Sequence, residues 1–504
     1  MPFENTSDLP AYNWVGESFA ESLTDLFARL DSRGTGLRVI PNGQRKVVQQ
    51  KLRLPLTALP SLATSIKLAN QSGAKLLVLG KYSVTAEQGD VAANLRVTVR
   101  VIKVSDGTFL GETLKDGRTI IRTIDLADAL TKLQTLQGQV AHQVLYQREG
   151  NALSLSQNEV IELSRRVPPR AFEAYVKGML TPATSETRAN LFKNALRLYG
   201  EEKNGEIYPQ ASLELGHYYL KLNDYQTAAD YFGRLQPSDS DFAEAAFYGG
   251  LMQWNLKNYD GAADTFRRLS DSTRLTQAYN NLGAVALYLA TQDKKNENKV
   301  ELLDEGLKVL QQASISAPDD VTTKFNYAYA LFAAKRFKES AEQLKQVLLA
   351  DQRDGQAYYL LSKANSRNGE TEPATLNDNN ARRYLPNYAR VETEWQKSST
   401  TNDIPFRLYT TFNRTEAVRN AEPLPSPQDD VQISLEKARG FSKAGRDDEA
   451  LTELRKILVK DSMNAETYLL IGNVSLRRGD FEVAVSNYKT AIFWKNDLIE
   501  GHIA

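Results

Sequence analysis

The strongest constraint on this chain is a small residue that recurs about every 34 positions in the last two thirds of the sequence. The spacing of 33 or 34 residues joins Gly216, Gly250 and Gly283, then Ala328 and Ser362, and then Ala438 and Gly472. A fixed period of this length is the signature of stacked supersecondary units, each of which buries its apolar face only against its neighbours. We therefore expect residues 171–504 to form a helical solenoid.

A second set of positions recurs with the same period. An alanine follows the small residue after twelve positions and an aromatic residue four positions later, as in Gly216, Ala228 and Phe232, in Gly250, Ala262 and Phe266, and in Gly472, Ala484 and Tyr488. This pattern predicts two antiparallel helices in each unit. The small residue lets the second helix approach the first, the alanine packs into that gap, and the aromatic ring fills the space between neighbouring units.

The spacing and these residue types resemble the tetratricopeptide repeat (TPR), a helical hairpin of 34 residues. The resemblance covers residues 171–504, with about seven recognisable repeats and a degenerate unit near 388–420, where Tyr388 to Gln396 and Pro405 to Phe412 are expected to be helical. The interval from Gly283 to Ala328 carries an insertion at Thr291 to Leu302. The alternative to a repeat array is a generic helical bundle.

The resemblance implies a concave groove that is lined by the first helix of each repeat and binds a peptide or protein partner. Aromatic and amide residues of the central repeats are the candidates: Phe247, Trp254, Asn281, Tyr288, Phe325, Asn326, Tyr329 and Tyr359. Exposed aromatic residues are common anchors at interfaces. The alternative is that many of these side chains only pack between neighbouring helices.

Two of these candidates match a motif of the family. Asn281 and Asn326 occupy an Asn position of the set with which some TPR domains hold a terminal carboxylate, but the flanking Lys and Arg positions hold Phe247, Leu251 and Thr322. We therefore do not expect carboxylate clamping. His217, beside the groove, is expected to be a polar packing residue.

Residues 1–148 alternate between helical and strand periodicity. Val15 to Leu30 predicts an amphipathic helix, Lys75 to Val84 a buried strand, Leu95 to Val101 an alternating strand, and Asp125 the cap of a long helix that carries Leu126, Leu130 and Leu133. The fold class predicted for the whole chain is thus an α/β layer domain (1–148), a linker (149–170) that ends at a double proline, and an all-α TPR superhelix (171–504).

The first domain resembles the amino-terminal domain of TolB and its relatives among bacterial envelope proteins. The resemblance rests on Pro2 to Asn5, Trp14 to Ser18, Leu37 to Ile40, Ala74 to Tyr82 and Ser105 to Gly107. It implies a bacterial cell-envelope setting. In such domains an apolar strand precedes the Pro-Phe-Glu-Asn turn, so we expect the start to be trimmed, with a strand and an export signal removed. The chain is then periplasmic, and otherwise cytoplasmic.

Composition argues against most other functions. The 62 basic and 62 acidic residues balance, whereas nucleic-acid binding needs a basic excess. There is no cysteine, and the three histidines are far apart in sequence. No glycine-rich phosphate loop or hydrolase motif occurs. No apolar run approaches the roughly 20 residues of a membrane-spanning helix. We therefore expect neither an enzyme nor a cofactor or metal site.

The predicted function is a non-enzymatic interaction scaffold whose TPR groove binds a peptide or protein, in a bacterial envelope assembly. Two alternatives stay open: a cytoplasmic signalling scaffold, and small-ligand sensing by the α/β domain. The sequence leaves the partner and the oligomeric state undetermined.

Overall fold

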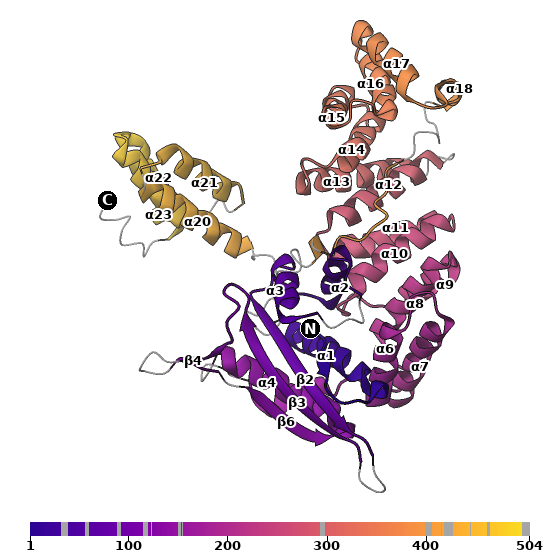
Figure 1. The fold of residues 1–504 in the computed structure, drawn as a ribbon. Coiled ribbons are helices and arrows are strands. Elements are labelled where there is room, and N and C mark those ends of the chain that lie inside the picture. Colours follow the sequence, from indigo (N-terminus) through magenta and orange to yellow (C-terminus); the bar gives the residue numbers. More distant parts are fainter. Residues whose placement is uncertain are drawn as a thin grey trace. The chain divides into compact units, whose positions relative to one another are not determined.

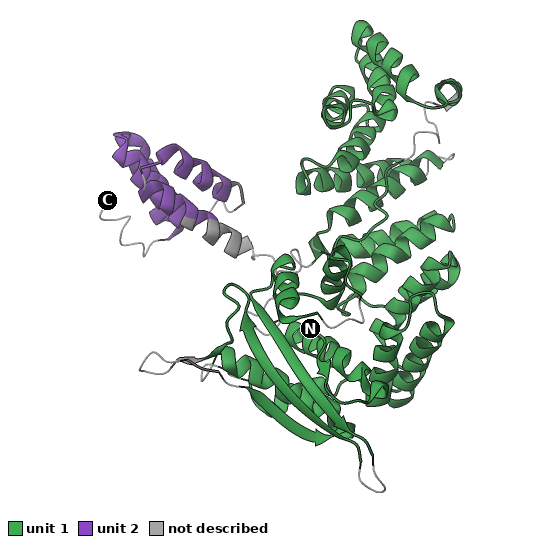
Figure 2. Cartoon of the chain, in the orientation of Figure 1, with its two compact units in different colours: residues 1–417 green, residues 418–504 purple. Residues whose placement is uncertain are grey.

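The chain folds into two compact units, residues 1–417 and 418–504 (Figure 2). The computed structural model describes residues 1–31, 39–55, 60–87, 92–113, 119–121, 123–149, 153, 155–292, 298–398, 406–414, 416–417, 427–443, 445–460 and 464–495. The centre of the insertion predicted at 291–302 and part of the segment Leu37 to Ile40 lie outside these residues.

The first unit begins with a four-stranded sheet of order β1-β2-β3-β6. Its strands are β1 (Glu4–Asn5), β2 (Leu76–Thr85), β3 (Asn94–Lys103) and β6 (Ile124–Ala129). β1 pairs with β2 in parallel and the other pairs are antiparallel, with Tyr82 opposite Val97 and Val97 opposite Leu126. A separate small ribbon joins β4 (Gly111–Thr113) and β5 (Thr119–Ile121).

Helices accompany the sheet, as Figure 1 shows. They are α1 (Trp14–Asp31), α2 (Asn42–Lys51), α3 (Leu62–Gln71), α4 (Leu133–Glu149) and α5 (Gln157–Ser164), with 3₁₀ turns at Pro10–Tyr12 and Leu130–Lys132. The apolar stripe of α1 and the inward-facing side chains of β3 belong to one core, which continues into the first helices of the array. The predicted helix at 15–30 and the two predicted strands are present.

One predicted helix is wrong at its start. Residues 124–129 form β6 at the sheet edge, and α4 begins only at Leu133. Ile124 is buried and Asp125 is exposed, so the segment has the period of a strand. Leu126, Leu130 and Leu133 have helical spacing although Leu126 lies in the strand and the other two lie in the helical segment that follows. The spacing arises because both elements pack on the same core.

The backbone of α1 contacts the β1 segment at Gly16. Phe3 stacks on Phe19 with ring centroids 4.5 Å apart, and the Phe3 amide donates to the Gly16 carbonyl at 3.1 Å. A Cβ added at Gly16 would lie 2.2 Å from the Phe3 carbonyl oxygen, closer than any real contact. The helix and the first strand can therefore pack only over a glycine.

We expect Gly16→Ala to displace the β1 segment and to lower the free energy of unfolding by roughly 2 kcal/mol or more, as overpacking does. Gly440→Ala is the matched control, because nothing lies within 4 Å of a Cβ there and the residue is within a helix. That change should be neutral or stabilising by up to about 1 kcal/mol. Chemical denaturation measures both, and equal effects would contradict this packing account.

Six helical hairpins follow in the described part of the first unit. They are α6 (Pro169–Leu180) with α7 (Glu186–Glu202), α8 (Pro209–Lys221) with α9 (Tyr225–Phe232), α10 (Phe242–Asn255) with α11 (Tyr259–Ser272), α12 (Thr276–Gln292) with α13 (Lys299–Ser316), α14 (Val321–Ala333) with α15 (Phe337–Ala350), and α16 (Gly355–Arg367) with α17 (Thr371–Tyr384). The predicted linker contains α5, and its double proline starts α6, where Pro169 is the first helical residue.

The recurring glycine and aromatic residue pack against each other within the α8–α9 and α10–α11 hairpins. A Cβ on Gly216 would lie 2.5 Å from the Phe232 ring, and a Cβ on Gly250 would lie 2.7 Å from the Phe266 ring. The glycine therefore makes room for the aromatic ring of the second helix, which explains the sixteen-residue spacing. The aromatic ring packs on the small residue of its own hairpin, in addition to any contact with the next one.

The first unit ends differently from the prediction of a degenerate hairpin. Residues 388–398 form helix α18 (Tyr388–Ser398), but residues 406–413 are not helical. The expectation of a second helix over Pro405 to Phe412 is therefore wrong for its described part. The physical reason is that these backbone groups find hydrogen-bond partners on other helices, as shown below.

The described part of the second unit contains two further hairpins, α20 (Pro427–Lys443) with α21 (Asp447–Lys460) and α22 (Ala465–Arg477) with α23 (Phe481–Trp494). The same packing of a glycine against an aromatic ring recurs here, since a Cβ on Gly472 would lie 2.5 Å from the Tyr488 ring. The repeat pattern thus continues on both sides of residues 406–417.

Candidate functional site

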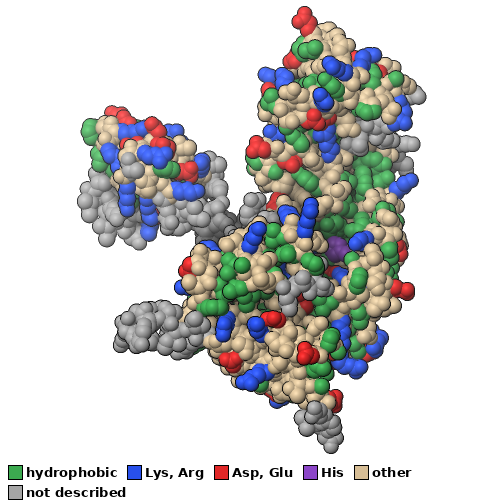
Figure 3. All heavy atoms as spheres, in the orientation of Figure 1, with side chains coloured by type: hydrophobic (Ala, Val, Ile, Leu, Met, Phe, Trp, Pro, Cys, Tyr) green, Lys and Arg blue, Asp and Glu red, His purple; other side chains and the backbone are tan. Residues whose placement is uncertain are grey.

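The candidate site is the face of the array that is formed by α10, α12, α14 and the start of α16. Residues 406–414, of which 406–413 are coil and Arg414 is helical, cross this face, and Figure 1 draws the coil in orange across α12. We call this segment the strap. It contacts Asp354 near its beginning and Glu244 near its end, so it runs opposite to the order of the repeats. Figure 3 shows hydrophobic side chains gathered on the side of the array where Figure 1 draws this coil.

Two buried asparagines hold the backbone of the strap. Asn326 accepts from the Arg407 amide at 2.9 Å and donates to the Arg407 carbonyl at 2.7 Å. Asn281 does the same for Tyr409, at 2.8 and 2.9 Å. Each side-chain amide thus satisfies both backbone groups of one residue, and the next such residue is two positions along. A neighbouring β-strand would offer the same pattern of bonds.

Further polar groups on α12 continue this row. Gln277 donates to the Thr411 carbonyl at 2.7 Å and accepts from the Asn413 amide at 2.7 Å. Asn280 donates a further bond to the Arg407 carbonyl at 2.8 Å. The asparagines are fully buried and Gln277 is nearly so. These amides are buried with the strap in place, and its backbone supplies the partners that buried polar groups need.

The side chains at the beginning of the strap occupy separate subsites. The Phe406 ring lies 4.8 Å from the Tyr329 ring, centroid to centroid. The Arg407 guanidinium lies 3.6 Å above the centre of the Phe325 ring and donates to the Asp354 carboxylate at 2.6 Å. This is a cation–π contact combined with an ion pair, a strong site for arginine.

The middle of the strap uses a carboxylate and an aromatic ring. Burial, together with the effect of the Asp320 carboxylate, raises the pKa of Tyr409 well above its usual value. Phe412 lies 5.6 Å from the Phe247 ring, centroid to centroid. Burial likewise raises the pKa of Tyr329 to about 12, so both tyrosines are neutral at physiological pH.

Arg414 closes the far end of the strap. Its guanidinium pairs with the nearly buried Glu244 carboxylate, which also accepts from His217 at 2.9 Å. Burial acts to raise the pKa of Glu244, but His217 and Arg414 together hold it below its usual value, so Glu244 is ionised at neutral pH. A Cβ at Gly43 would lie 3.4 Å from Arg414 Nε, so α2 of the first domain borders this end of the groove.

Five of the eight predicted groove residues contact the strap: Phe247, Asn281, Phe325, Asn326 and Tyr329. Trp254 and Tyr288 instead pack against each other and Tyr259, with centroids about 5 Å apart. Tyr359 is covered by α18, where its hydroxyl donates to Glu392 at 2.9 Å. A role of these eight residues in partner binding stays a prediction.

Sequence reasoning misses several residues of the site. Gln277, Glu244 and the acidic caps Asp320 and Asp354 are not among the predicted groove residues, and the helix predicted over 405–412 includes most of the strap. A signal for the strap is present, since residues 406–414 are rich in aromatic residues and carry an arginine near each end. His217 is a polar packing residue, as expected, and it packs on the carboxylate that binds Arg414.

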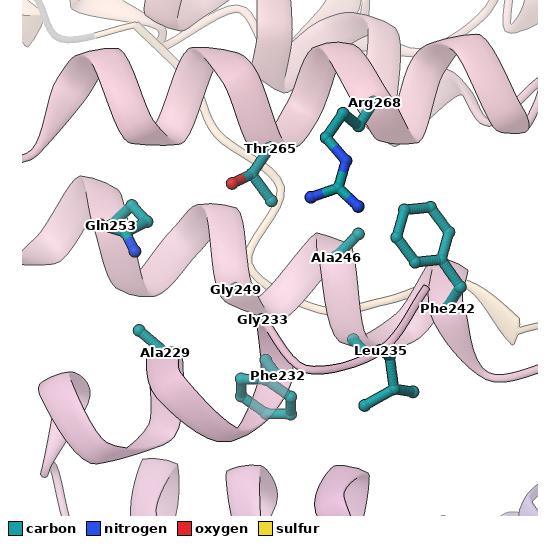
Figure 4. Close-up of a pocket in the computed structure, with 11 residues that line it drawn as sticks. Ala229, Phe232, Gly233, Leu235, Phe242, Ala246, Gly249, Gln253, Thr265 and Arg268 are labelled. Carbon is teal, nitrogen blue, oxygen red and sulfur yellow. The ribbon is translucent and has the colours of Figure 1, made fainter. Parts of the chain in front are cut away.

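No other feature of the described residues competes with this groove. A cavity of about 50 Å³ lies between α9, α10 and α11, where Arg268, Thr265 and Gln253 line it beside apolar residues (Figure 4). This volume suits one or two water molecules. Over the same part of the chain, no cluster of three potential metal ligands occurs, and no helix is both long and apolar enough to span a bilayer.

Comparisons with known proteins identify the repeats. Residues 213–273 and 301–364 match models of the tetratricopeptide repeat, and residues 465–502 match the model described as SHNi-TPR. The chain therefore contains tetratricopeptide repeats, and the predicted fold class, an α/β layer followed by an all-α solenoid, is confirmed. No curated protein matches the chain.

Solved structures with similar folds include TPR proteins. YrrB, described as a TPR protein with an unusual peptide-binding site, has 19% identity and a TM-score of 0.34, and the match covers 41% of this chain and 99% of YrrB. MamA has 12% identity and a TM-score of 0.31, covering 38% and 96%. The TPR protein TTC0263 from Thermus thermophilus has 20% identity and a TM-score of 0.29, covering 38% and 99%.

Proposed function

We propose that the TPR array of this chain is a non-enzymatic receptor for an extended segment of a protein partner. The observation that carries the proposal is the pair Asn281 and Asn326, whose amides hold both backbone groups of alternate residues in an extended segment. The groove therefore has a means of binding a polypeptide backbone.

The residue types favour recognition of backbone over recognition of a chain end. An asparagine amide offers one acceptor and two donors, so it can pair with an N–H and a C=O at once. A groove that binds only a terminal carboxylate needs cations, and Phe247 and Leu251 stand where the carboxylate clamp has them. Main-chain bonds provide affinity and side-chain subsites provide specificity, as when a strand is added to a sheet.

Peptide binding to a chain with a weakened strap tests the proposal. In the full chain with Phe406→Ala, Tyr409→Ala and Phe412→Ala, the groove residues are intact and the strap has lost its aromatic anchors. A fluorescent peptide with the natural sequence of residues 406–417 should bind this variant, and fluorescence anisotropy measures the affinity. Adding Asn281→Ala and Asn326→Ala should weaken binding at least about thirtyfold, since four hydrogen bonds of roughly 0.5–1.5 kcal/mol each are removed.

Asn365→Ala in the same weakened background is the control. Asn365 is a fully buried asparagine of α16 whose side-chain amide has no hydrogen-bond partner in the structure. It should leave peptide affinity unchanged. If the peptide does not bind the folded triple variant, or binds equally well without Asn281 and Asn326, the groove is not a backbone receptor.

We further propose a bacterial envelope setting. The support is the resemblance of residues 1–148 to amino-terminal domains of TolB relatives, carried by Pro2 to Asn5, Trp14 to Ser18 and Ala74 to Tyr82. Cell fractionation with the natural gene under its own promoter should recover the protein in the periplasm or envelope. Recovery in the cytoplasm alone would favour a cytoplasmic scaffold.

A further inference from the structure

We infer that the strap is an internal ligand: it closes the groove in the free chain, and a partner binds by displacing it with a segment of similar aromatic and basic chemistry. This inference rests on the proposed function and adds to it both the kind of partner and a regulation. The groove is occupied in the structure. The side-chain nitrogen and oxygen of Asn281 both bind the backbone of Tyr409, and those of Asn326 both bind the backbone of Arg407. A second backbone can reach these amides only after the first has left.

The strap is held like a ligand and not like a core element. None of residues 406–414 is fully buried, and Thr410, Thr411 and Asn413 are exposed. The buried residues of the neighbouring apolar clusters all come from the repeat hairpins, α18 and the segments beside them, while the apolar strap residues are partly buried against them. The repeats thus keep their own core when the strap leaves, so displacement does not require unfolding of the array.

The subsites define what can replace the strap. Phe325, Asp354 and Gln356 surround the Arg407 guanidinium, and Glu244 receives that of Arg414 seven residues later. Between these two acidic positions, the groove offers ring contacts from Tyr329 and Phe247. The competing segment therefore combines an aromatic residue followed by arginine, a tyrosine two residues on, then phenylalanine, and a second arginine.

Attachment of the strap to its own receptor strengthens the closed state. A tethered ligand has an effective concentration that reaches the millimolar range for short linkers. The apparent affinity of a free segment is then reduced in proportion to the fraction of chains whose groove is open. Binding of a partner and release of the strap, which is continuous with the second unit, are thus the same event.

The test compares the natural chain with the Phe406→Ala, Tyr409→Ala and Phe412→Ala variant, using the labelled peptide of residues 406–417 as the probe. The natural chain should bind the peptide at least tenfold more weakly than the variant does. Peptide at saturating concentration should also speed tryptic cleavage after Arg407 in the natural chain, as measured by mass spectrometry. A peptide with Arg407→Glu and Arg414→Glu should neither bind the variant tightly nor speed cleavage of the natural chain, since Asp354 and Glu244 would repel it.

The outcomes separate the two proposals. Equal affinity of the peptide for the natural chain and the variant would overturn the internal ligand and leave the groove a receptor. No binding to the folded variant would overturn the proposed function, and with it this inference. Circular dichroism and thermal unfolding establish that the variant is folded before either conclusion is drawn.

Discussion

Replacing Asn281 and Asn326 together by alanine is expected to release the strap and to raise the rate of tryptic cleavage after Arg407 at least about thirtyfold. The two side chains make four hydrogen bonds to the strap backbone, at 2.7–2.9 Å. At roughly 0.5–1.5 kcal/mol net for each bond, their loss destabilises the closed state by about 2–6 kcal/mol. Cleavage of a locally opened segment follows its open population when opening is fast, so the rate reports this free energy.

The control separates strap release from general loosening of the array. Asn365→Ala removes an equally buried asparagine, in α16, whose amide has no partner. Its cleavage rate after Arg407 should equal that of the natural chain. If the double variant is cleaved no faster than the control, the asparagines do not hold the strap.

A second large effect is expected where α2 packs on α1. Arg45 donates to the Glu17 carboxylate at 2.5 Å, and both side chains are at least nine-tenths buried. It also donates to Asn42 at 3.0 Å and to Gln49 at 3.2 Å. Arg45→Met leaves the Glu17 carboxylate buried without its closest cation, and Lys46 lies farther away at 3.6 Å. We expect a loss of about 3–5 kcal/mol in the free energy of unfolding, as for other broken buried pairs.

The same substitution in a surface pair provides the comparison. Arg197 and Glu201 form an exposed pair one helical turn apart. Arg197→Met should therefore cost at most about 0.5 kcal/mol. Adding Glu17→Leu to Arg45→Met should recover part of the stability, because the unpaired buried charge is removed. Urea denaturation measures all three variants. Equal costs at Arg45 and Arg197 would mean that the buried pair does not position α2.

The repeats can be predicted because their packing repeats in sequence. The glycine at 216 and the aromatic residue at 232 must keep their spacing for the second helix to approach the first, and the same geometry returns in further hairpins. The position of Asn281 and Asn326 in the groove is likewise predictable from their register relative to Gly283 and Ala328.

The occupant of the groove cannot be predicted in the same way. The strap contacts α12 from about 130 residues away in sequence, and its conformation is set by the amides of Asn280, Asn281 and Asn326 instead of by its own periodicity. A helix is therefore predicted where the chain forms a coil between two helical segments. The prediction for the start of α4 is wrong for a related reason, since Leu126 pairs with β3, and that pairing is a tertiary contact.

Hydrogen exchange at the strap backbone tests the central claim most directly. In the structure the amides of Arg407, Tyr409 and Asn413 donate to Asn326, Asn281 and Gln277. In the natural full chain these amides should exchange at least about a hundredfold more slowly than in the free peptide of residues 406–417, since exchange then requires the strap to open. Exchange at the rate of the free peptide would show that the strap does not occupy the groove in solution, and would contradict its role as an internal ligand.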